Sequence, residues 1–246
     1  MAEQPASLPI AIIGTGRMGA AVAALARSHG CEVVATIPSR DNAGGAGITR
    51  ESLRGARVAI EFTVPASAPD NVRACARAGC PVVVGTTGWH EQRAAVERDV
   101  VAAGGAMLAA GNFSIGANIF FAAARDAAAR FAMANGFDAH IVETHHAKKL
   151  DAPSGTALTL KHGVDSALGR DVPITSIRVG SVPGTHELLF DGAFEQVRLV
   201  HDVRDRRVFA DGALIAARWL AGRRGIYSID DVLGARQAPD SSTERA

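Results

Sequence analysis

The sequence predicts an α/β protein, with a parallel sheet in its first half and an α+β region after it. Three observations lead to this prediction. Short apolar strands alternate with helical segments up to about residue 110, which favours a parallel sheet with helices on both faces. A glycine-rich loop at residues 14–19 follows the first strand. After about Ser114 the pattern changes to longer helices and extended stretches separated by turns.

The expected elements of the first half are short and alternate regularly. The first strand, at residues 9–13, is apolar and ends at a glycine, as a buried strand does. An alanine-rich helix follows it. Strands are expected at residues 9–13, 32–37, 57–62, 81–84 and 106–109, and helices at 18–28, 66–78 and 91–103.

The second half is expected to combine helices with antiparallel strands. A long helix at residues 115–133 precedes a strand at 138–143, and another helix begins near Pro153. Three extended stretches follow, at 174–180, 186–190 and 195–203. The turns Pro183-Gly184 and Asp191-Gly192 separate them, which predicts hairpins. A last helix at 207–220 precedes an apolar segment at 227–233.

The composition is that of a globular protein with no nucleic-acid or membrane partner. The formal net charge is +1, and no apolar run approaches the ~20 residues that span a bilayer. The three cysteines, Cys31, Cys75 and Cys80, lack disulfide or zinc spacing, and residues 1–8 lack signal-peptide features. We therefore expect a cytoplasmic protein, with residues 1–8 as a loose arm and the polar residues 237–246 as a frayed tail.

The loop Gly14-Thr15-Gly16-Arg17-Met18-Gly19 has the G-x-G-x-x-G pattern between a strand and a helix. The first glycine suits a tight turn, the second lets backbone approach a pyrophosphate, and the third lets helix and strand pack closely. The helix N-terminus then offers N–H groups to phosphates. A glycine-rich turn without a ligand is the alternative, but the strand–loop–helix context favours a Rossmann-like dinucleotide site.

The residues after the second strand bear on the choice of cofactor. An acidic residue that would hold the ribose hydroxyls of NADH is absent there, and Asp41 comes a few residues late. Ser39 and Arg40, with Arg17, can instead hold a 2′-phosphate. The alternative is that Arg40 is a solvated loop charge. We predict a weak preference for NADPH, with NADH also used.

Two more loops leave strand ends on the same edge of the expected sheet. They are Gly85-Thr86-Thr87, continued by Gly88, and Ala110-Gly111-Asn112-Phe113. Ligands of open α/β sheets bind outside the carboxyl ends of the strands. Small residues and hydroxyls at this edge would let a nicotinamide ring lie close to the backbone.

The run from Val142 to Ala157 gathers proton donors, cations and a helix start. His145, His146 and Lys149 follow a predicted strand. Pro153 is expected in the first turn of the next helix, with Asp151 or Ala152 as its cap. The N–H groups of Gly155 and Thr156, together with Lys148 or Lys149, form an anion site, and a histidine beside it can supply a proton.

Other interpretations of this run carry less weight. A lone histidine on a strand is usually structural, and a Lys-Lys pair is usually solvated. Metal binding by His140, His145 and His146 lacks a fourth ligand and any cysteine spacing, so no metal site is expected. The density of these residue types together favours a catalytic or substrate-binding role.

The run Glu143-Thr144-His145-His146-Ala147-Lys148-Lys149-Leu150-Asp151-Ala152-Pro153-Ser154-Gly155-Thr156-Ala157 resembles the signature E-x-H-H-x-x-K-x-D-A-P-S-G-T-A of the 4-hydroxy-tetrahydrodipicolinate reductase family. The resemblance extends over nearly the whole chain. Matching segments include the glycine-rich loop, Gly85-Thr86-Thr87-Gly88, Asn112-Phe113-Ser114-Ile115-Gly116, Arg178-Val179-Gly180, Gly184-Thr185-His186 and Phe209-Ala210-Asp211-Gly212-Ala213-Leu214.

The resemblance implies roles for individual residues. His145 takes the proton-donor position and Lys149 that of its catalytic partner. His146, Gly155 and Thr156 fall on positions that bind a small dicarboxylate substrate. Contacts with NADPH or NADH fall on residues 14–19, 85–87 and 110–113. Two departures from the family pattern are the missing acidic residue after the second strand and Gly111, where alanine or proline is usual.

The resemblance also implies an organisation and a reaction. Residues 1–114 and 206–246 form a split dinucleotide-binding domain around a central α+β substrate and tetramerisation domain, residues 115–205, and the protein is a homotetramer. Hinges are expected near Ser114 and Arg206. The nicotinamide reduces a conjugated cyclic imine and His145 supplies the proton. Two rivals are a paralogous NADPH-dependent reductase of another small cyclic imine or carboxylate, and a non-catalytic NADPH-binding sensor.

Overall fold

The computed structural model describes residues 7–234, which divide into two compact units. Unit 1 comprises residues 7–113 and 209–234, and unit 2 comprises residues 114–208. Of the arm expected at residues 1–8, residues 1–6 lie outside the described residues, and Leu8 is not part of an arm because it begins the first strand. The tail expected at residues 237–246 also lies outside the described residues. Within residues 7–234, no helix combines the length and the apolar character that crossing a bilayer requires.

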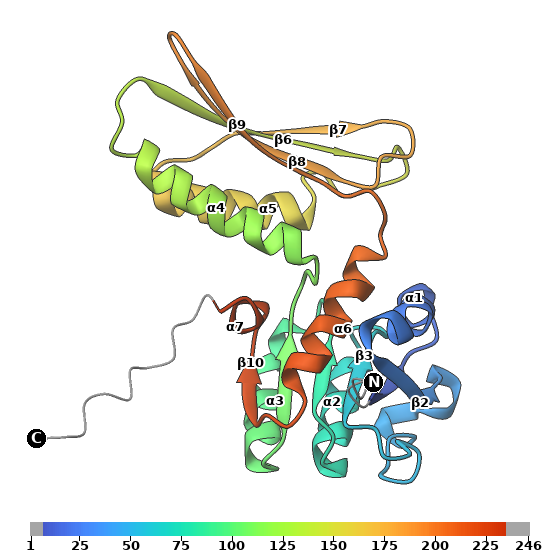
Figure 1. The fold of residues 1–246 in the computed structure, drawn as a ribbon. Coiled ribbons are helices and arrows are strands. Elements are labelled where there is room, and N and C mark those ends of the chain that lie inside the picture. Colours follow the sequence, from blue (N-terminus) through green and yellow to red (C-terminus); the bar gives the residue numbers. More distant parts are fainter. Residues whose placement is uncertain (1–6, 235–246) are drawn as a thin grey trace, which may run out of the picture. The chain divides into compact units, whose positions relative to one another are not determined.

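Unit 1 is built on a parallel sheet of strand order β10-β5-β4-β3-β1-β2 (Figure 1). The inner strands β1, β3, β4 and β5 are buried on both faces, so they are nearly continuous apolar runs rather than alternating ones. The strands are β1(Leu8–Ile13), β2(Cys31–Ile37), β3(Val58–Glu61), β4(Val82–Val84), β5(Ala106–Ala109) and β10(Gly225–Tyr227). The last of these returns from the end of the chain to pair with β5.

The helices of unit 1 come from both ends of the chain. They are α1(Arg17–Ala26), α2(Ala68–Ala78), α3(His90–Ala102), α6(Val208–Leu220) and the short α7(Ile229–Val232). One core contains residues of α2 and α3, including Val72 and Val96, together with strand residues such as Ile13 and Met107. Arg218 of α6 donates to the carbonyl oxygen of Gly30 at 3.1 Å, which ties the late helix to the turn before β2.

Unit 2 is a four-stranded sheet, of order β7-β6-β8-β9, with two helices packed on one face (Figure 1). The strands are β6(Phe137–His145), β7(Ile174–Arg178), β8(Thr185–Gly192) and β9(Gln196–Asp202), and the helices are α4(Ile115–Phe131) and α5(Gly155–Leu168). Phe120, Leu160, Ile141 and Phe190 form part of the core between helices and sheet. The opposite face carries exposed apolar residues, among them Ile177 and Val200.

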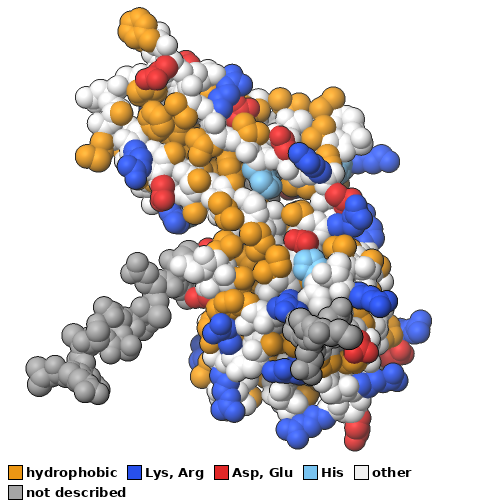
Figure 2. Space-filling model, in the orientation of Figure 1, with side chains coloured by type: hydrophobic (Ala, Val, Ile, Leu, Met, Phe, Trp, Pro, Cys, Tyr) orange, Lys and Arg blue, Asp and Glu red, His pale blue; other side chains and the backbone are white. Residues whose placement is uncertain are grey.

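Exposed hydrophobic side chains are distributed unequally between the units. Among the described residues, most of the large exposed ones belong to unit 2, and Figure 2 shows hydrophobic side chains gathered on the surface of that unit. The examples in unit 2 are Ile119, Met133, Leu150, Leu158, Ile177, Val179, Phe194, Val197 and Val200, against Val64 and Val101 in unit 1.

Most element bounds agree with the sequence-based expectation to within two residues, and three details differ. The expected hairpin at Pro183-Gly184 is wrong, because β7 pairs with β6 in parallel and β8 lies on the other side of β6. The second expected hairpin is present: β8 and β9 pair through a turn at residues 193–195. The segment at 227–233 divides into the end of β10 and α7. The expected cap of α5 is also wrong, as described below.

Candidate active site

The glycine-rich loop of unit 1 is shaped by close packing at two of its three glycines. Gly14 has a φ of +98°, and a Cβ added there would lie 2.1 Å from the carbonyl oxygen of Phe62. A Cβ on Gly19 would lie 2.0 Å from the carbonyl oxygen of Gly14. At Gly16 a Cβ would meet no atom within 4 Å. The first and third glycines are therefore needed by the fold itself, whereas the second leaves open space.

The open space at Gly16 lies at the start of α1. Gly16 is the N-cap residue, no side chain caps the helix, and its first turn holds no acidic residue. Thr15 and Arg17 are exposed and Met18 is half-buried. The first N–H groups of a helix have no intrahelical acceptor and carry the positive end of the helix dipole. This part of the loop can therefore receive an anionic group such as a pyrophosphate.

The other expected cofactor loops reach the same carboxyl edge of the sheet, because β1, β3, β4 and β5 are parallel neighbours. Thr86 is buried, and its Oγ1 accepts the N–H of Thr63 at 2.7 Å. A Cβ on Gly85 would lie 1.9 Å from the ring of Phe62, so glycine is required there. Thr87 is exposed.

The loop after β5 and the residues after β2 differ in exposure. Gly111 is exposed, Ala110 and Asn112 are half-buried, and Phe113 is buried with its ring edge-on to Phe62, 6.2 Å between centroids. Arg40 points to solvent, with 83 % of its side chain exposed, and its Nε lies 3.5 Å from Oδ2 of Asp41. The backbone of residues 110–113 is thus better placed for ligand contact than the Phe113 ring.

A buried carboxyl that the sequence analysis missed lies beneath these loops. Glu61 at the end of β3 is fully buried and accepts hydrogen bonds from Asn71 and Thr63. Asn71 also accepts a hydrogen bond from Asn42, in the loop after β2. Burial raises the pKa of Glu61, and these hydrogen bonds oppose that rise. The network joins the loops after β2 and β3 to helix α2, and a charged residue at the end of an apolar run was its one visible signal in the sequence.

In unit 2, His145 is the last residue of β6 and is only 7 % exposed. Its Nδ1 lies 2.6 Å from Oε2 of Glu143, two residues earlier on the same side of the strand. The two groups form an ion pair at this separation when the His145 ring is protonated. Glu143 is fully buried, and its other oxygen, Oε1, accepts from Arg178 and from the N–H of Ser154.

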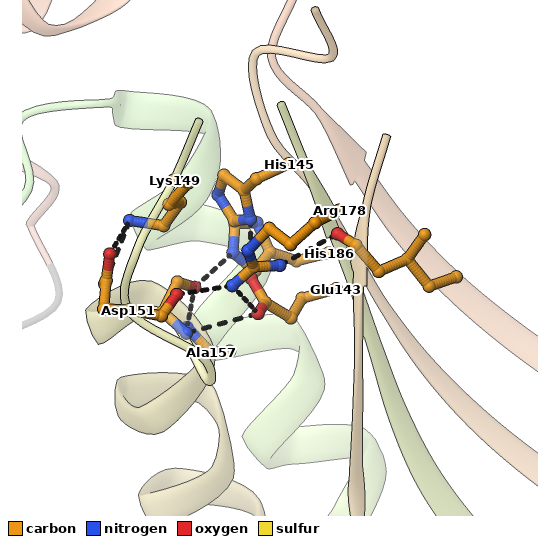
Figure 3. A network of polar contacts seen from close by, with 9 residues as sticks. Glu143, His145, Lys149, Asp151, Ala157, Arg178 and His186 are labelled. Carbon is orange, nitrogen blue, oxygen red and sulfur yellow. Dashed lines mark hydrogen bonds and ion pairs between the residues drawn. The ribbon is translucent and has the colours of Figure 1, made fainter. Parts of the chain in front are cut away.

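Arg178 connects the end of β6 to the loop that follows this strand (Figure 3). Its Nη2 lies 2.6 Å from Oε1 of Glu143 and 2.6 Å from the carbonyl oxygen of Asp151. Lys149 is drawn to the same loop, because its Nζ lies 2.7 Å and 3.0 Å from the two carboxylate oxygens of Asp151. Glu143 and Arg178 had no expected role, and Asp151 was expected only as a helix cap, although all three lie in the segments that carried the resemblance.

The start of α5 faces this cluster. Ser154 is the N-cap residue, and its Oγ accepts the N–H of Ala157 at 3.1 Å. Asp151 and Ala152 are therefore not the cap, and Pro153 lies outside the helix because it precedes the N-cap residue. The carboxylate of Asp151 is held by Lys149 and its carbonyl oxygen by Arg178. Gly155 and Thr156 provide the first two N–H groups of α5, which have no acceptor within the helix. The expected anion site at Gly155 and Thr156 requires such N–H groups, and it stays a prediction.

His186 of β8 completes the cluster and was also missed. Its ring lies edge-on to that of His145, 5.2 Å between centroids, and its Nε2 lies 3.3 Å from Oγ of Ser154. Burial lowers the pKa of His186 to about 4. His146, the first residue after β6, is half-buried, and its carbonyl oxygen accepts the N–H of Lys149 at 3.0 Å.

The charged groups around His145 change its pKa in opposite directions. Burial lowers the pKa of His145, Lys149 and Arg178 lower it further, and Glu143 raises it. Glu143 itself stays ionised: burial raises its pKa, but hydrogen bonds from Ser176, Arg178 and Ser154 outweigh this effect and hold the value at about 2. His145 therefore always faces a full negative charge near neutral pH.

Donor atoms of Glu143, His145 and His186 lie within 4.8 Å of one another. A divalent cation here would have to break the contact between Glu143 and His145 and compete with Arg178 for the carboxylate. His140, which the sequence analysis weighed as a ligand, lies elsewhere: its Nε2 contacts Oγ1 of Thr175 at 2.8 Å.

Comparison with known proteins identifies relatives over both units. Residues 8–113 match the family described as dihydrodipicolinate reductase, N-terminus, and residues 116–233 match dihydrodipicolinate reductase, C-terminus. A 4-hydroxy-tetrahydrodipicolinate reductase of Thiobacillus denitrificans is 37 % identical, covering 94 % of this chain and 100 % of the relative. One of Christiangramia forsetii is 32 % identical, covering 91 % and 97 %.

Solved structures with a similar fold include a dipicolinate-bound dihydrodipicolinate reductase from Paenisporosarcina sp. TG-14. It has a TM-score of 0.76 and 22 % identity, with 90 % of this chain and 97 % of that chain covered. A myo-inositol dehydrogenase from Corynebacterium glutamicum has a TM-score of 0.55 and 15 % identity, covering 89 % and 90 %. At these identities the likeness concerns the fold.

Proposed function

Because this chain belongs to the dihydrodipicolinate reductase family, we propose that it reduces 4-hydroxy-tetrahydrodipicolinate to tetrahydrodipicolinate with a nicotinamide dinucleotide, in diaminopimelate and lysine biosynthesis. The observation that carries the proposal within the structure is the position of His145. It combines a proton-bearing ring, an ionised partner in Glu143 and a helix N-terminus close by.

Unit 2 supplies the groups that a cyclic dicarboxylate requires. We assign one carboxylate to the N–H groups of Gly155 and Thr156, with Lys149 and His146 beside them. Lys149 is held by Asp151 in the structure, so binding of the carboxylate would exchange one anionic partner for another. A charge-assisted hydrogen bond of this kind contributes about 1.5–3 kcal/mol before solvent screening.

His145 is assigned as the proton donor and Lys149 as its catalytic partner. A positioned general acid typically contributes about 10²–10⁴-fold to the rate. The nearby positive charges of Lys149 and Arg178 make the protonated ring a readier donor, because they favour its neutral form.

Unit 1 is assigned to the dinucleotide, which supplies the hydride when bound. The pyrophosphate would lie at residues 14–19, with the N–H groups of Arg17 and Met18 directed to it, and the nicotinamide would lie near residues 85–87 and 110–113. A weak preference for NADPH over NADH rests on Arg40 and on the lack of an acidic residue at the end of β2.

Two further expectations belong to this proposal. A homotetramer formed through unit 2 is supported by the exposed apolar residues on the face of its sheet away from α4 and α5, such as Ile177 and Val200. A cytoplasmic location is supported by the three free cysteines, all of which are buried. Equilibrium sedimentation of the purified chain tests the first of these expectations.

Turnover tests the main proposal. Loss of NADPH absorbance is followed with freshly generated 4-hydroxy-tetrahydrodipicolinate, and His145→Ala is expected to lower kcat by about 10²-fold or more while the Kd for NADPH stays the same. His162→Ala is the matched control, because His162 is an exposed histidine on α5. No turnover by the wild type contradicts the proposal. Faster turnover of another small cyclic imine would favour a paralogous reductase instead.

A further inference from the structure

The two nitrogens of His145 have different surroundings. Nδ1 lies 2.6 Å from Oε2 of Glu143, inside the unit. Nε2 points toward Gly184, where a Cβ would lie 3.1 Å from it. A side chain at residue 184 would therefore crowd this nitrogen. Nδ1 of His145 thus contacts the buried carboxylate of Glu143. Nε2 stays accessible because residue 184 is a glycine.

Glu143 is itself held by two other elements, β7 and the start of α5. Arg178 of β7 donates to Oε1 at 2.6 Å, and the N–H of Ser154, the cap residue of α5, donates to the same oxygen at 3.3 Å. Glu143 is fully buried, and Arg178 is mostly so, with 17 % of its side chain exposed. The Glu143 carboxylate therefore has little freedom to move away from Nδ1 of His145. It is also tied to the start of α5, where the anion site is proposed, through the N–H of Ser154.

We propose that Glu143 is the positioning residue of His145: it holds the proton of Nδ1 in place, so that Nε2 is the nitrogen that carries and delivers the proton to the substrate. This inference rests on the proposed function and deepens it. In each turnover the Nε2–H bond breaks, the reduced substrate takes the proton, and water restores the proton to Nε2 after product leaves. The proton between Nδ1 and Glu143 stays in place throughout.

Four charged or titratable groups face the ring of His145. Glu143 favours the protonated ring, while Lys149, Arg178 and the neighbouring His186 disfavour it when they carry charge. Removing the charge of Glu143 leaves only the opposing groups. The ring should then lose its proton at lower pH, and a single opposite charge at this distance typically changes such a titration by about 1–3 pH units.

Glu143→Gln is the main test, because it keeps the shape of the side chain and removes its charge. We expect kcat to fall by about tenfold or more. The alkaline limb of the kcat profile, where the acid becomes deprotonated, should move to lower pH by about one unit or more. The Kd for NADPH should not change. Glu187→Gln, on β8 and paired with Arg198, is the matched control and should leave the profile unmoved.

A second measurement does not depend on the variant folding. In wild-type protein above the titration of His145, nitrogen NMR of the ring should show the neutral form with its proton on Nδ1. A proton on Nε2 in the neutral form overturns the inference, as does a Glu143→Gln variant that loses activity with an unmoved pH profile. If the wild type does not reduce the substrate, the proposed function fails instead, and the NMR result still decides what Glu143 does.

Discussion

Arg178 and Glu143 form a buried ion pair, with Nη2 of Arg178 2.6 Å from Oε1 of Glu143. The pair joins two strands that run in parallel, β7 and β6. Because Arg178 also holds the carbonyl oxygen of Asp151, the same guanidinium sets the carboxylate behind His145 and the loop that carries Lys149. The positions of Glu143 and of the loop that carries Lys149, which both neighbour the proposed proton donor His145, therefore depend on Arg178.

Arg178→Met is expected to destabilise the protein by about 3–5 kcal/mol, because it leaves the Glu143 carboxylate buried without a cation. Combining it with Glu143→Gln should recover much of that loss, since neither charge then remains. Chemical denaturation of the two single variants and the double variant measures the effect. Simple additivity of the two losses would mean that the pair does not act as a unit.

The free energy of unfolding at acidic pH should also depend on the Arg178–Glu143 pair. The pKa of Glu143 is lowered to about 2 in the folded protein from its usual value of 4.5. Its contribution is therefore complete above pH 4.5 and is lost as the pH falls toward about 2. In Glu143→Gln the unfolding free energy should fall less steeply across this range than in wild type. Equal slopes in both proteins would contradict the assigned cause.

His186 predicts a second pH effect, at higher pH. Its folded pKa is lowered by burial to about 4 from the usual 6.5, so the neutral ring is the folded form. Stability is therefore complete above pH 6.5 and declines as the pH falls through this window, by up to about 1.4 kcal/mol per pH unit for one group. Denaturation between pH 6.5 and 4.5, where the contribution of Glu143 is complete and does not change, should show a shallower decline in His186→Gln. The exposed His162→Gln is the control and should decline as wild type does.

Sequence patterns were enough for most elements of the fold. Strands such as β1 and β4 are buried on both faces, so they appear as short apolar runs between glycines and helices. The glycine-rich loop is recognisable from the spacing of its glycines alone. His145, Lys149, Gly155 and Thr156 lie within twelve residues of sequence, so their proximity could be predicted from one local segment.

Contacts between distant strands could not be predicted in the same way. Arg178 is 35 residues from Glu143, and His186 is 32 residues from Ser154. A turn before Thr185 suggests a hairpin, and only the pairing of β7 with β6 brings Arg178 to the carboxylate. The cap of α5 was misassigned for a related reason. Asp151 suits a cap by residue type, but its carboxylate and its carbonyl oxygen are held by Lys149 and Arg178.

The three glycines of the cofactor loop should respond differently to alanine. Gly14→Ala and Gly19→Ala should lower the melting temperature, because a Cβ would lie 2.1 Å and 2.0 Å from backbone oxygens. Gly16→Ala meets open space at an ordinary φ of −72°, so it should fold normally but weaken NADPH binding by occupying the ligand's place. Thermal unfolding and NADPH titration separate the two effects. Unchanged NADPH affinity in Gly16→Ala would remove the pyrophosphate from this loop.

Arg40 is expected to influence the choice between NADPH and NADH. Its side chain is 83 % exposed and paired only loosely with Asp41, so solvent screens any contact with a 2′-phosphate. Exposed ion pairs of this kind contribute about 0.2–1 kcal/mol, which corresponds to a factor of about two to five. Arg40→Ala should therefore lower the NADPH-to-NADH ratio of kcat/KM by a few fold and leave turnover with NADH unchanged. Arg54→Ala, at another arginine in the segment between β2 and β3, is the control and should keep the wild-type ratio. A wild-type preference for NADH, or an unchanged ratio in Arg40→Ala, would show that Arg40 is a solvated loop charge without a role in cofactor choice.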